Sequence, residues 1–137
     1  MKRRIAVIAI LLALAMILAA CKGGFVISGT NSKLTIKIED AKNDAYAESQ
    51  DFSVGKNKAA SVTSSLEKGK LKIDFVEVVV TKDDKDNEQI DYFGTKATVT
   101  VGPGETQKVE IPNGDYVMQL TAVGETTGTV VVEIVDK

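Results

Sequence analysis

Apolar and polar residues alternate with a period of two along most of the chain from Phe25 onward. This pattern predicts β-strands with one face toward a core. In the stretch KLTIKIE, Leu34, Ile36 and Ile38 share one face, and polar or charged residues occupy the other. The same alternation predicts strands at 96–101, 107–111, 116–123 and 129–135, with shorter candidates at 51–54, 59–66 and 89–93.

One further predicted strand, residues 70–80, changes phase within itself. Its apolar residues occupy odd positions as far as Phe75 and even positions from Val76 onward. A β-bulge, which inserts one extra residue, would keep both sets on the core face and would suit a long strand that bends between two sheets. A strand buried on both faces explains the same residues, so the alternation leaves both interpretations open.

Turn-forming residues separate most of these strands. Gly, Pro and Asn gather at 101–105 (VGPGE) and 112–115 (PNGD), and 123–128 (VGETTG) is expected to be the hairpin loop between the last two strands. Residues 39–50 are interpreted as a flexible stretch or a short turn. No long helical period is present. The fold class predicted for residues 25–137 is therefore all-β, a single antiparallel β-sandwich or jelly roll of about eight strands.

The N-terminal segment, residues 1–20, differs from this pattern. A basic start, Lys2 to Arg4, precedes an uncharged apolar run from Ile5 to Ala20. As a helix this run would extend about 24 Å, which is short of the roughly 30 Å hydrocarbon core of a membrane. A basic start, a short apolar run and small residues at its end are typical of a helical secretory signal peptide, residues 1–20. A retained transmembrane anchor is the alternative.

The single cysteine, Cys21, directly follows this run. Leu18-Ala19-Ala20-Cys21 resembles the lipobox of bacterial lipoproteins at all four positions. The resemblance implies cleavage by signal peptidase II between Ala20 and Cys21 and attachment of a diacylglyceryl group, with acyl chains such as palmitate, to the Cys21 sulfur. Residues 21–24 would then be the lipidated cysteine and a short tether. The partner would be the membrane, either the cell membrane or an outer membrane, on its extracytoplasmic face. A buried structural cysteine is the alternative.

Charge and composition narrow the classes of function. The segment 1–20 holds three of the 17 basic residues and none of the 19 acidic ones, so the mature chain would carry a net charge of −5. An acidic domain is a poor binder of nucleic acid. The chain has no histidine, which excludes Ser-His-Asp and Cys-His triads and the usual zinc sites. We predict no cofactor, no metal centre and no enzymatic activity, although two carboxylates could still hydrolyse a glycoside.

The acidic stretch TKDDKDNEQ (81–89) is a candidate cation loop. Its carboxylates are Asp83, Asp84, Asp86 and Glu88. Three of them alternate as at the start of an EF-hand, and oxygen ligands suit calcium. However, Gln89 stands where that motif needs glycine, and Thr95 stands where it needs glutamate. A hydrated hairpin loop is the competing interpretation.

A few aromatic residues have no obvious place on a core face. Tyr92 and Phe93 are adjacent, so on a strand one of them should point outward, and together they are a candidate ligand contact. Tyr46 is the third aromatic without an assigned core face. Packing in the core or at its rim is the alternative for all three. Tyr116 follows the PNGD turn, which suits a tyrosine corner, in which the hydroxyl binds nearby backbone.

The C-terminal third has a second resemblance. Gly114-Asp115-Tyr116, the glycines at 124 and 128, and the apolar run 130–135 are similar to the closing strands of bacterial pre-peptidase C-terminal and GOLD-like β-sandwich domains. Such domains act in binding, packing or adhesion. Together these features predict a membrane-anchored extracytoplasmic lipoprotein that is a non-catalytic binding or envelope-interaction module, whose partner would be another envelope protein. The alternative is a surface lipoprotein that binds a glycan or a cation.

Overall fold

The computed structural model describes residues 24–137, and these residues form an all-β fold. The expected signal peptide, residues 1–20, and the expected lipidation site at Cys21 lie outside the described residues. The described part contains no helix that is long and apolar enough to cross a membrane. The eight strands are β1 (Phe25–Gly29), β2 (Lys33–Ala41), β3 (Tyr46–Glu48), β4 (Phe52–Val54), β5 (Lys58–Lys82), β6 (Glu88–Val101), β7 (Thr106–Ile111) and β8 (Gly114–Asp136).

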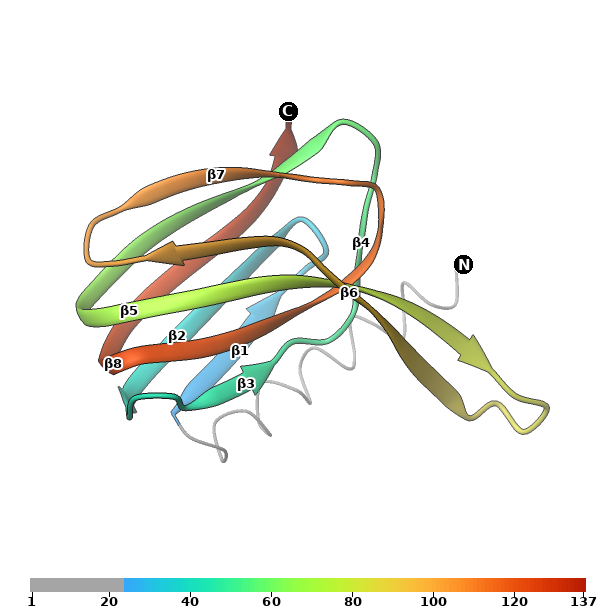
Figure 1. Cartoon of the computed structure of the whole chain (residues 1–137), viewed down its shortest axis with the longest axis horizontal. Helices are drawn as coiled ribbons and strands as arrows, with labels where there is room; N and C mark the ends of the chain where they lie inside the picture. The colour runs from blue at the N-terminus through green and yellow to red at the C-terminus, as the bar shows by residue number, and fades with distance from the viewer. Residues whose placement is uncertain (1–23) are drawn as a thin grey trace.

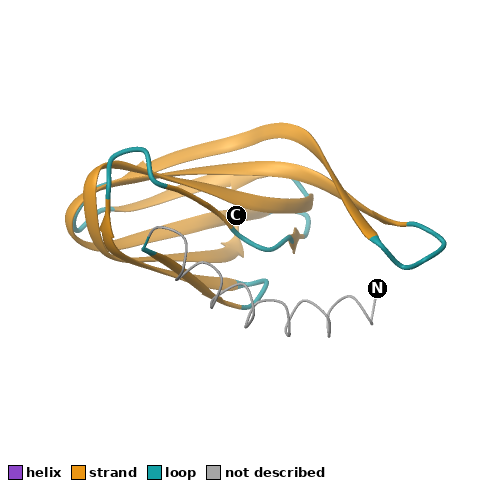
Figure 2. Ribbon diagram, turned by 90° about the horizontal axis from the view of Figure 1, so that it is seen from below, coloured by secondary structure: helices purple, strands orange, loops and turns teal. Residues whose placement is uncertain are grey.

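The two longest strands, β5 and β8, organise the fold. They pair antiparallel from Lys58 opposite Asp136 to Val78 opposite Asp115, and the register shifts only between Leu66 and Lys70. At that point both strands turn back together, as the green-to-lime and orange-to-red ribbons show (Figure 1). Figure 2 shows the same bend from another side, with the two halves of the ribbon lying over each other.

The remaining strands extend the two halves into two layers. In one layer β7 pairs with the first half of β5, β2 pairs with the second half of β8, and β1 pairs with β2. In the other layer β6 pairs with the second half of β5, while β3 and β4 pair with the first half of β8. All of these pairs are antiparallel, so the predicted all-β antiparallel sandwich is confirmed.

The hydrophobic core fills the space between the layers. Every strand except β3 and β7 contributes several buried apolar side chains or a buried aromatic, and the alternation predicts which side of each strand faces inward. The largest buried side chains are Tyr116, Phe25, Phe75, Ile27, Ile36, Ile38, Leu71, Ile73, Met118 and Leu120. Removing such a side chain from water stabilises the fold by about 1.5–3 kcal/mol. Phe25, directly after the expected tether, already belongs to this core.

Several predicted boundaries are wrong because glycines bend these strands without ending them. Residues 123–128 are not a hairpin loop but the bent centre of β8, where Gly124 and Gly128 have φ angles of +76° and +136°. The segments 59–66 and 70–80 likewise form one strand, β5, and Gly69 lies at its bend with φ +81°.

The stretch interpreted as flexible, 39–50, contains the end of β2 and all of β3.

The phase change at Phe75 and Val76 has a different cause from the expected bulge in β5. The pairing of β5 with β8 runs through this point without a shift, whereas the pairing with β6 shifts, so the extra residue is Lys96 on β6. Phe75 therefore faces the main core, and Val76 faces the opposite side with Val78 and Val117 in a second small apolar cluster. The strand is buried on both faces, as the alternative interpretation held.

Two local features complete the fold. Tyr116 forms a tyrosine corner, because its buried hydroxyl donates a 2.8 Å hydrogen bond to the carbonyl oxygen of Pro112. Beyond the sandwich, the end of β5 and the start of β6 continue as a two-stranded arm that projects from the two layers (Figures 1 and 2).

The bend of β5 can be tested with a matched pair of glycine substitutions. Gly69 and Gly104 have similar φ angles of +81° and +72°, but a Cβ atom at Gly69 would overlap the Thr126 hydroxyl oxygen, whereas one at Gly104 meets nothing within 4 Å. We expect Gly104→Ala to lower the free energy of unfolding by about 1 kcal/mol, the cost of the left-handed backbone. Gly69→Ala should lower it by about 2–4 kcal/mol, because crowding adds to that cost.

Urea denaturation followed by circular dichroism measures both values. Equal losses for the two variants would contradict the close packing described for the bend.

Candidate functional site

The outer side of the layer formed by β3, β8, β5 and β6 carries a row of polar side chains. Glu48 lies opposite Gln119, Gln119 opposite Asp74, and Asp74 opposite Thr98, so the row crosses all four strands. The neighbouring row consists of Ala47, Leu120, Ile73 and Val99, which pack toward the core. Because side chains alternate between the faces of a sheet, the polar row points away from the core. We call this surface, with Tyr46 and Tyr92, the tyrosine face.

Glu48 is the centre of the hydrogen bonds on the tyrosine face. Its Oε1 accepts hydrogen bonds from the Tyr46 hydroxyl at 3.2 Å and from Gln119 Nε2 at 3.2 Å. Its Oε2 accepts a third from the Tyr92 hydroxyl at 2.8 Å. One carboxylate therefore fixes the hydroxyl ends of two tyrosines that come from β3 and β6, on opposite edges of the layer.

The bond between Tyr92 and Glu48 reaches over the middle of the layer. The registers place the two residues three strands and four residues apart, which in a flat sheet is about 20 Å between Cα atoms. The layer must therefore curl and twist toward this side. The line between the two residues passes over Val76 and Val117, which are only 4% and 1% exposed although they lie on the outer side.

The second polar cluster on this face is formed by Asp74. Its Oδ1 accepts a 2.6 Å hydrogen bond from the Thr98 hydroxyl, and its Oδ2 lies 3.9 Å from the Lys72 ammonium nitrogen. Thr121 and Thr100 lie opposite Lys72 on the two neighbouring strands and extend the polar surface. The face thus offers carboxylate, amide, hydroxyl and ammonium groups across four strands.

The surroundings of the tyrosines change their acidity. Partial burial, followed by the charge and the hydrogen bond of Glu48, raises the pKa of Tyr46 to about 12. The hydrogen bond to Glu48 is the largest cause of the raised pKa of Tyr92. Burial, with a smaller effect of Glu77, raises the pKa of Tyr116 to about 12. Tyr46 and Tyr92 therefore remain neutral hydrogen-bond donors throughout the physiological pH range.

Tyr92 and Phe93, the predicted ligand contact, have different surroundings in the structure. Both are exposed, by 52% and 58%, so neither is a core residue. Tyr92 joins the tyrosine face through Glu48, whereas Phe93 lies in the irregular part of β6 just before Gly94, which has φ +102°. Sequence reasoning missed Glu48, because it lies on a strand of only three residues, too short for alternation to be recognised.

The candidate cation loop is a tight turn between β5 and β6. Asp83 Oδ1 accepts hydrogen bonds from the backbone N–H groups of Lys85 and Asn87, at 2.8 and 2.9 Å, and Asp83 Oδ2 accepts one from the Asn87 side chain. These bonds hold the pKa of Asp83 below its usual value. Within residues 24–137, no group of three or more carboxylate, His or Cys side chains is placed to hold a metal ion. The geometry of Asp83 to Glu88 favours the hydrated hairpin loop.

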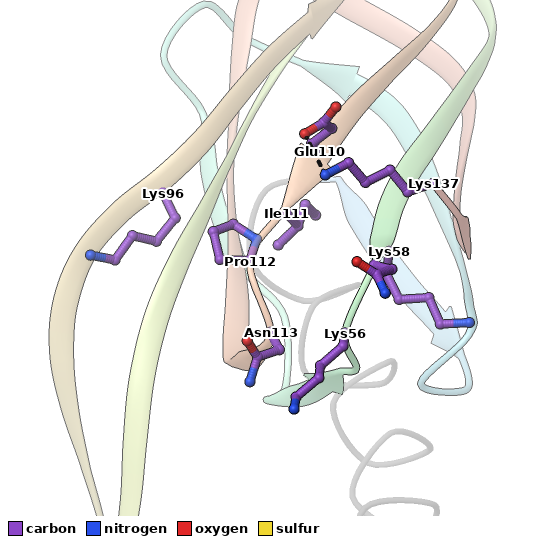
Figure 3. Close-up of a pocket in the computed structure, with 9 residues that line it drawn as sticks. Lys56, Lys58, Lys96, Glu110, Ile111, Pro112, Asn113 and Lys137 are labelled. Atoms are coloured by element: carbon purple, nitrogen blue, oxygen red, sulfur yellow. Dashed lines mark ion pairs between the residues drawn. The ribbon is translucent and has the colours of Figure 1, made fainter.

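A pocket of about 480 Å³ lies elsewhere, at the start of β5 and the end of β7 (Figure 3). Four lysines line it, but three of them are paired: Lys137 with Glu110 at 3.1 Å, Lys58 with Asp136 at 2.6 Å and Lys96 with Glu77 at 3.7 Å. The pocket therefore has little unbalanced positive charge with which to attract an anion.

Comparisons with known proteins add only distant likenesses of fold. Searches against models of protein families and against curated protein sequences find no match. The chain is similar in structure to PirA, with a TM-score of 0.47 and 11% identity over 78% of this chain and 96% of PirA.

It is also similar to a structure described as "CBM4 structure and function", with a TM-score of 0.32 and 13% identity over 85% of this chain and 80% of that one. A proposed sugar-binding protein from Bacteroides thetaiotaomicron gives a TM-score of 0.35 and 11% identity over 85% and 83%. At TM-scores below 0.5 these likenesses carry no argument about function.

The role of Glu48 at the tyrosine face can be tested by titration. In Glu48→Gln the negative charge that opposes tyrosine ionisation is lost, so the pKa of Tyr46 should fall from about 12 and that of Tyr92 should fall as well. Tyr46 should stay above the ordinary value of about 10, since burial remains its largest cause. The pKa values are measured by NMR on protein labelled with ¹³C at tyrosine Cζ, which resolves the three tyrosines.

Glu77→Gln is the matched control, because Glu77 acts on Tyr116 and not on the other two tyrosines. If Tyr46 and Tyr92 titrate at the same pH with and without the Glu48 carboxylate, the hydrogen-bond arrangement described for this face is wrong.

Proposed function

We propose that this protein is a membrane-anchored extracytoplasmic lipoprotein whose β-sandwich is a non-catalytic binding module. The lipobox Leu18 to Cys21 supports export and lipidation, and at least two acyl chains on Cys21 make the attachment stable, since one chain alone binds reversibly. The protein would be located at the cell membrane or an outer membrane, on the extracytoplasmic face.

The start of the fold supports a domain held close to the membrane. Phe25 is fully buried and belongs to β1, so only Lys22, Gly23 and Gly24 separate it from Cys21. Three extended residues reach roughly 10 Å. A module at this height meets ligands or envelope proteins that lie at the membrane surface.

The tyrosine face is the observation that carries the binding role. Two exposed aromatic rings are fixed by one carboxylate, Glu48, beside a row of polar side chains that crosses four strands. Tyrosine is enriched at interaction surfaces relative to the rest of a protein's surface. The same face favours the second candidate, a ligand-binding lipoprotein, over one whose only contact is another envelope protein.

The arrangement of the carboxylates favours binding over catalysis. Glu48 accepts three hydrogen bonds, and Asp74 is held by Thr98 and Lys72. Both carboxylates are therefore engaged by the protein's own side chains, whereas the two carboxyl groups of a glycosidase flank the glycosidic bond and act on the substrate.

Lipidation is tested with the variant Cys21→Ser. In a bacterial host fed labelled palmitate, the natural chain should incorporate label and appear in the membrane fraction, and Cys21→Ser should incorporate none, because it lacks the thiolate that attacks the lipid donor. Lys22→Ser is the control, since it leaves the lipobox intact and should be labelled normally. Labelled Cys21→Ser protein, or natural protein without label, would refute the proposed anchor.

A further inference from the structure

The tyrosine face places two aromatic rings beside a row of hydrogen-bonding groups. Tyr46 and Tyr92 are 51% and 52% exposed, and each hydroxyl is fixed on Glu48. We infer that this face binds a neutral saccharide, with the tyrosine rings against sugar rings and the polar row bound to sugar hydroxyls. The inference rests on the proposed binding function and names the class of its ligand.

The two rings match the apolar side of a sugar. A pyranose ring has a C–H face surrounded by hydroxyl groups, and the electron-rich face of an aromatic ring attracts such C–H groups. Because Glu48 holds both phenol hydroxyls, the rings are already oriented before a ligand arrives. Binding then orders few additional side chains, which lowers the entropy lost on association.

The polar row matches the hydroxyl rim. Each sugar hydroxyl both donates and accepts a hydrogen bond, so a complementary surface needs both kinds of group close together. Gln119 and Lys72 supply donors. Asp74 supplies an acceptor, as does Thr98, whose O–H is already donated to Asp74, and the Thr100 hydroxyl supplies both. Gln119 and Asp74 are half-buried and held by neighbours, so their positions are also fixed in advance.

The charges on this face argue against other classes of ligand. Two carboxylates, Glu48 and Asp74, face one ammonium group, Lys72, so a phosphate or an anionic lipid headgroup would be repelled. A protein interface usually has an apolar centre that is depleted of charge. Here the apolar residues of the face, Val76 and Val117, are almost fully covered, and the row Glu48, Gln119 and Asp74 beside them is polar. A neutral ligand rich in hydroxyl groups satisfies these side chains without burying an unpaired charge.

Binding is tested with the full chain in detergent micelles on a panel of immobilised neutral oligosaccharides. The panel contains gluco-, manno-, galacto-, xylo- and N-acetylglucosamine oligomers of about three to six units. The natural protein should bind at least one of them, and Tyr46→Ala and Tyr92→Ala should each weaken that binding at least tenfold. Tyr92→Phe should weaken it only a few-fold, because the ring remains. Because both tyrosines are exposed, the variants should keep the melting temperature of the natural protein. Measuring that temperature verifies that they fold.

Phe93→Ala is the matched control, because Phe93 is an exposed aromatic next to Tyr92 without a bond to Glu48. It should bind within about twofold of the natural protein. No binding to any member of the panel, or binding that the Tyr46→Ala/Tyr92→Ala double variant retains, would overturn the saccharide inference. If the panel is negative and cross-linking in intact cells recovers one envelope protein only when both tyrosines are present, the face binds protein instead. None of these outcomes changes the palmitate labelling of Cys21. A failure of the saccharide inference can therefore be distinguished from a failure of the proposed membrane anchor.

Discussion

The continuous pairing of β5 with β8, folded back on itself, is the constraint on which the rest of the structure depends. Both strands turn at the same place, so each strand contributes core-facing side chains to both layers. In β5, even-numbered residues such as Val62 face the core before the turn and odd-numbered residues such as Ile73 face it afterwards, whereas β8 keeps even-numbered residues in the core throughout. The register shifts between Leu66 and Lys70 supply the change of phase that this requires.

The strand faces could be predicted from the sequence because alternation is a local property. Leu34, Ile36 and Ile38 alternate within one short segment, and all three are buried. The ends of strands were harder to predict, because a glycine ends a strand in one place and bends it in another. Gly104 lies in a true turn beside Pro103, whereas Gly128 lies inside β8 against the backbone of Leu66. Only that long-range contact separates the two cases.

The candidate site shows the same division between local and long-range information. Tyr92 was predicted as a ligand contact because two adjacent aromatics cannot both face a core. Its hydrogen-bond acceptor Glu48 lies 44 residues away, in a stretch interpreted as flexible. The row that joins Glu48 to Asp74 exists only because β3, β8 and β5 take one particular register. Register depends on tertiary packing, so a pattern read along one segment cannot supply it.

The place of β8 in the chain also affects the order in which the protein gains structure. β8 follows β2, β3, β4 and β5 in sequence and pairs with all of them, and the contact between Lys58 and Asp136 closes a separation of 78 residues. Neither layer is complete until this strand has been synthesised. Such non-local pairing slows folding, because the entropy of a long loop is lost before the contacts form.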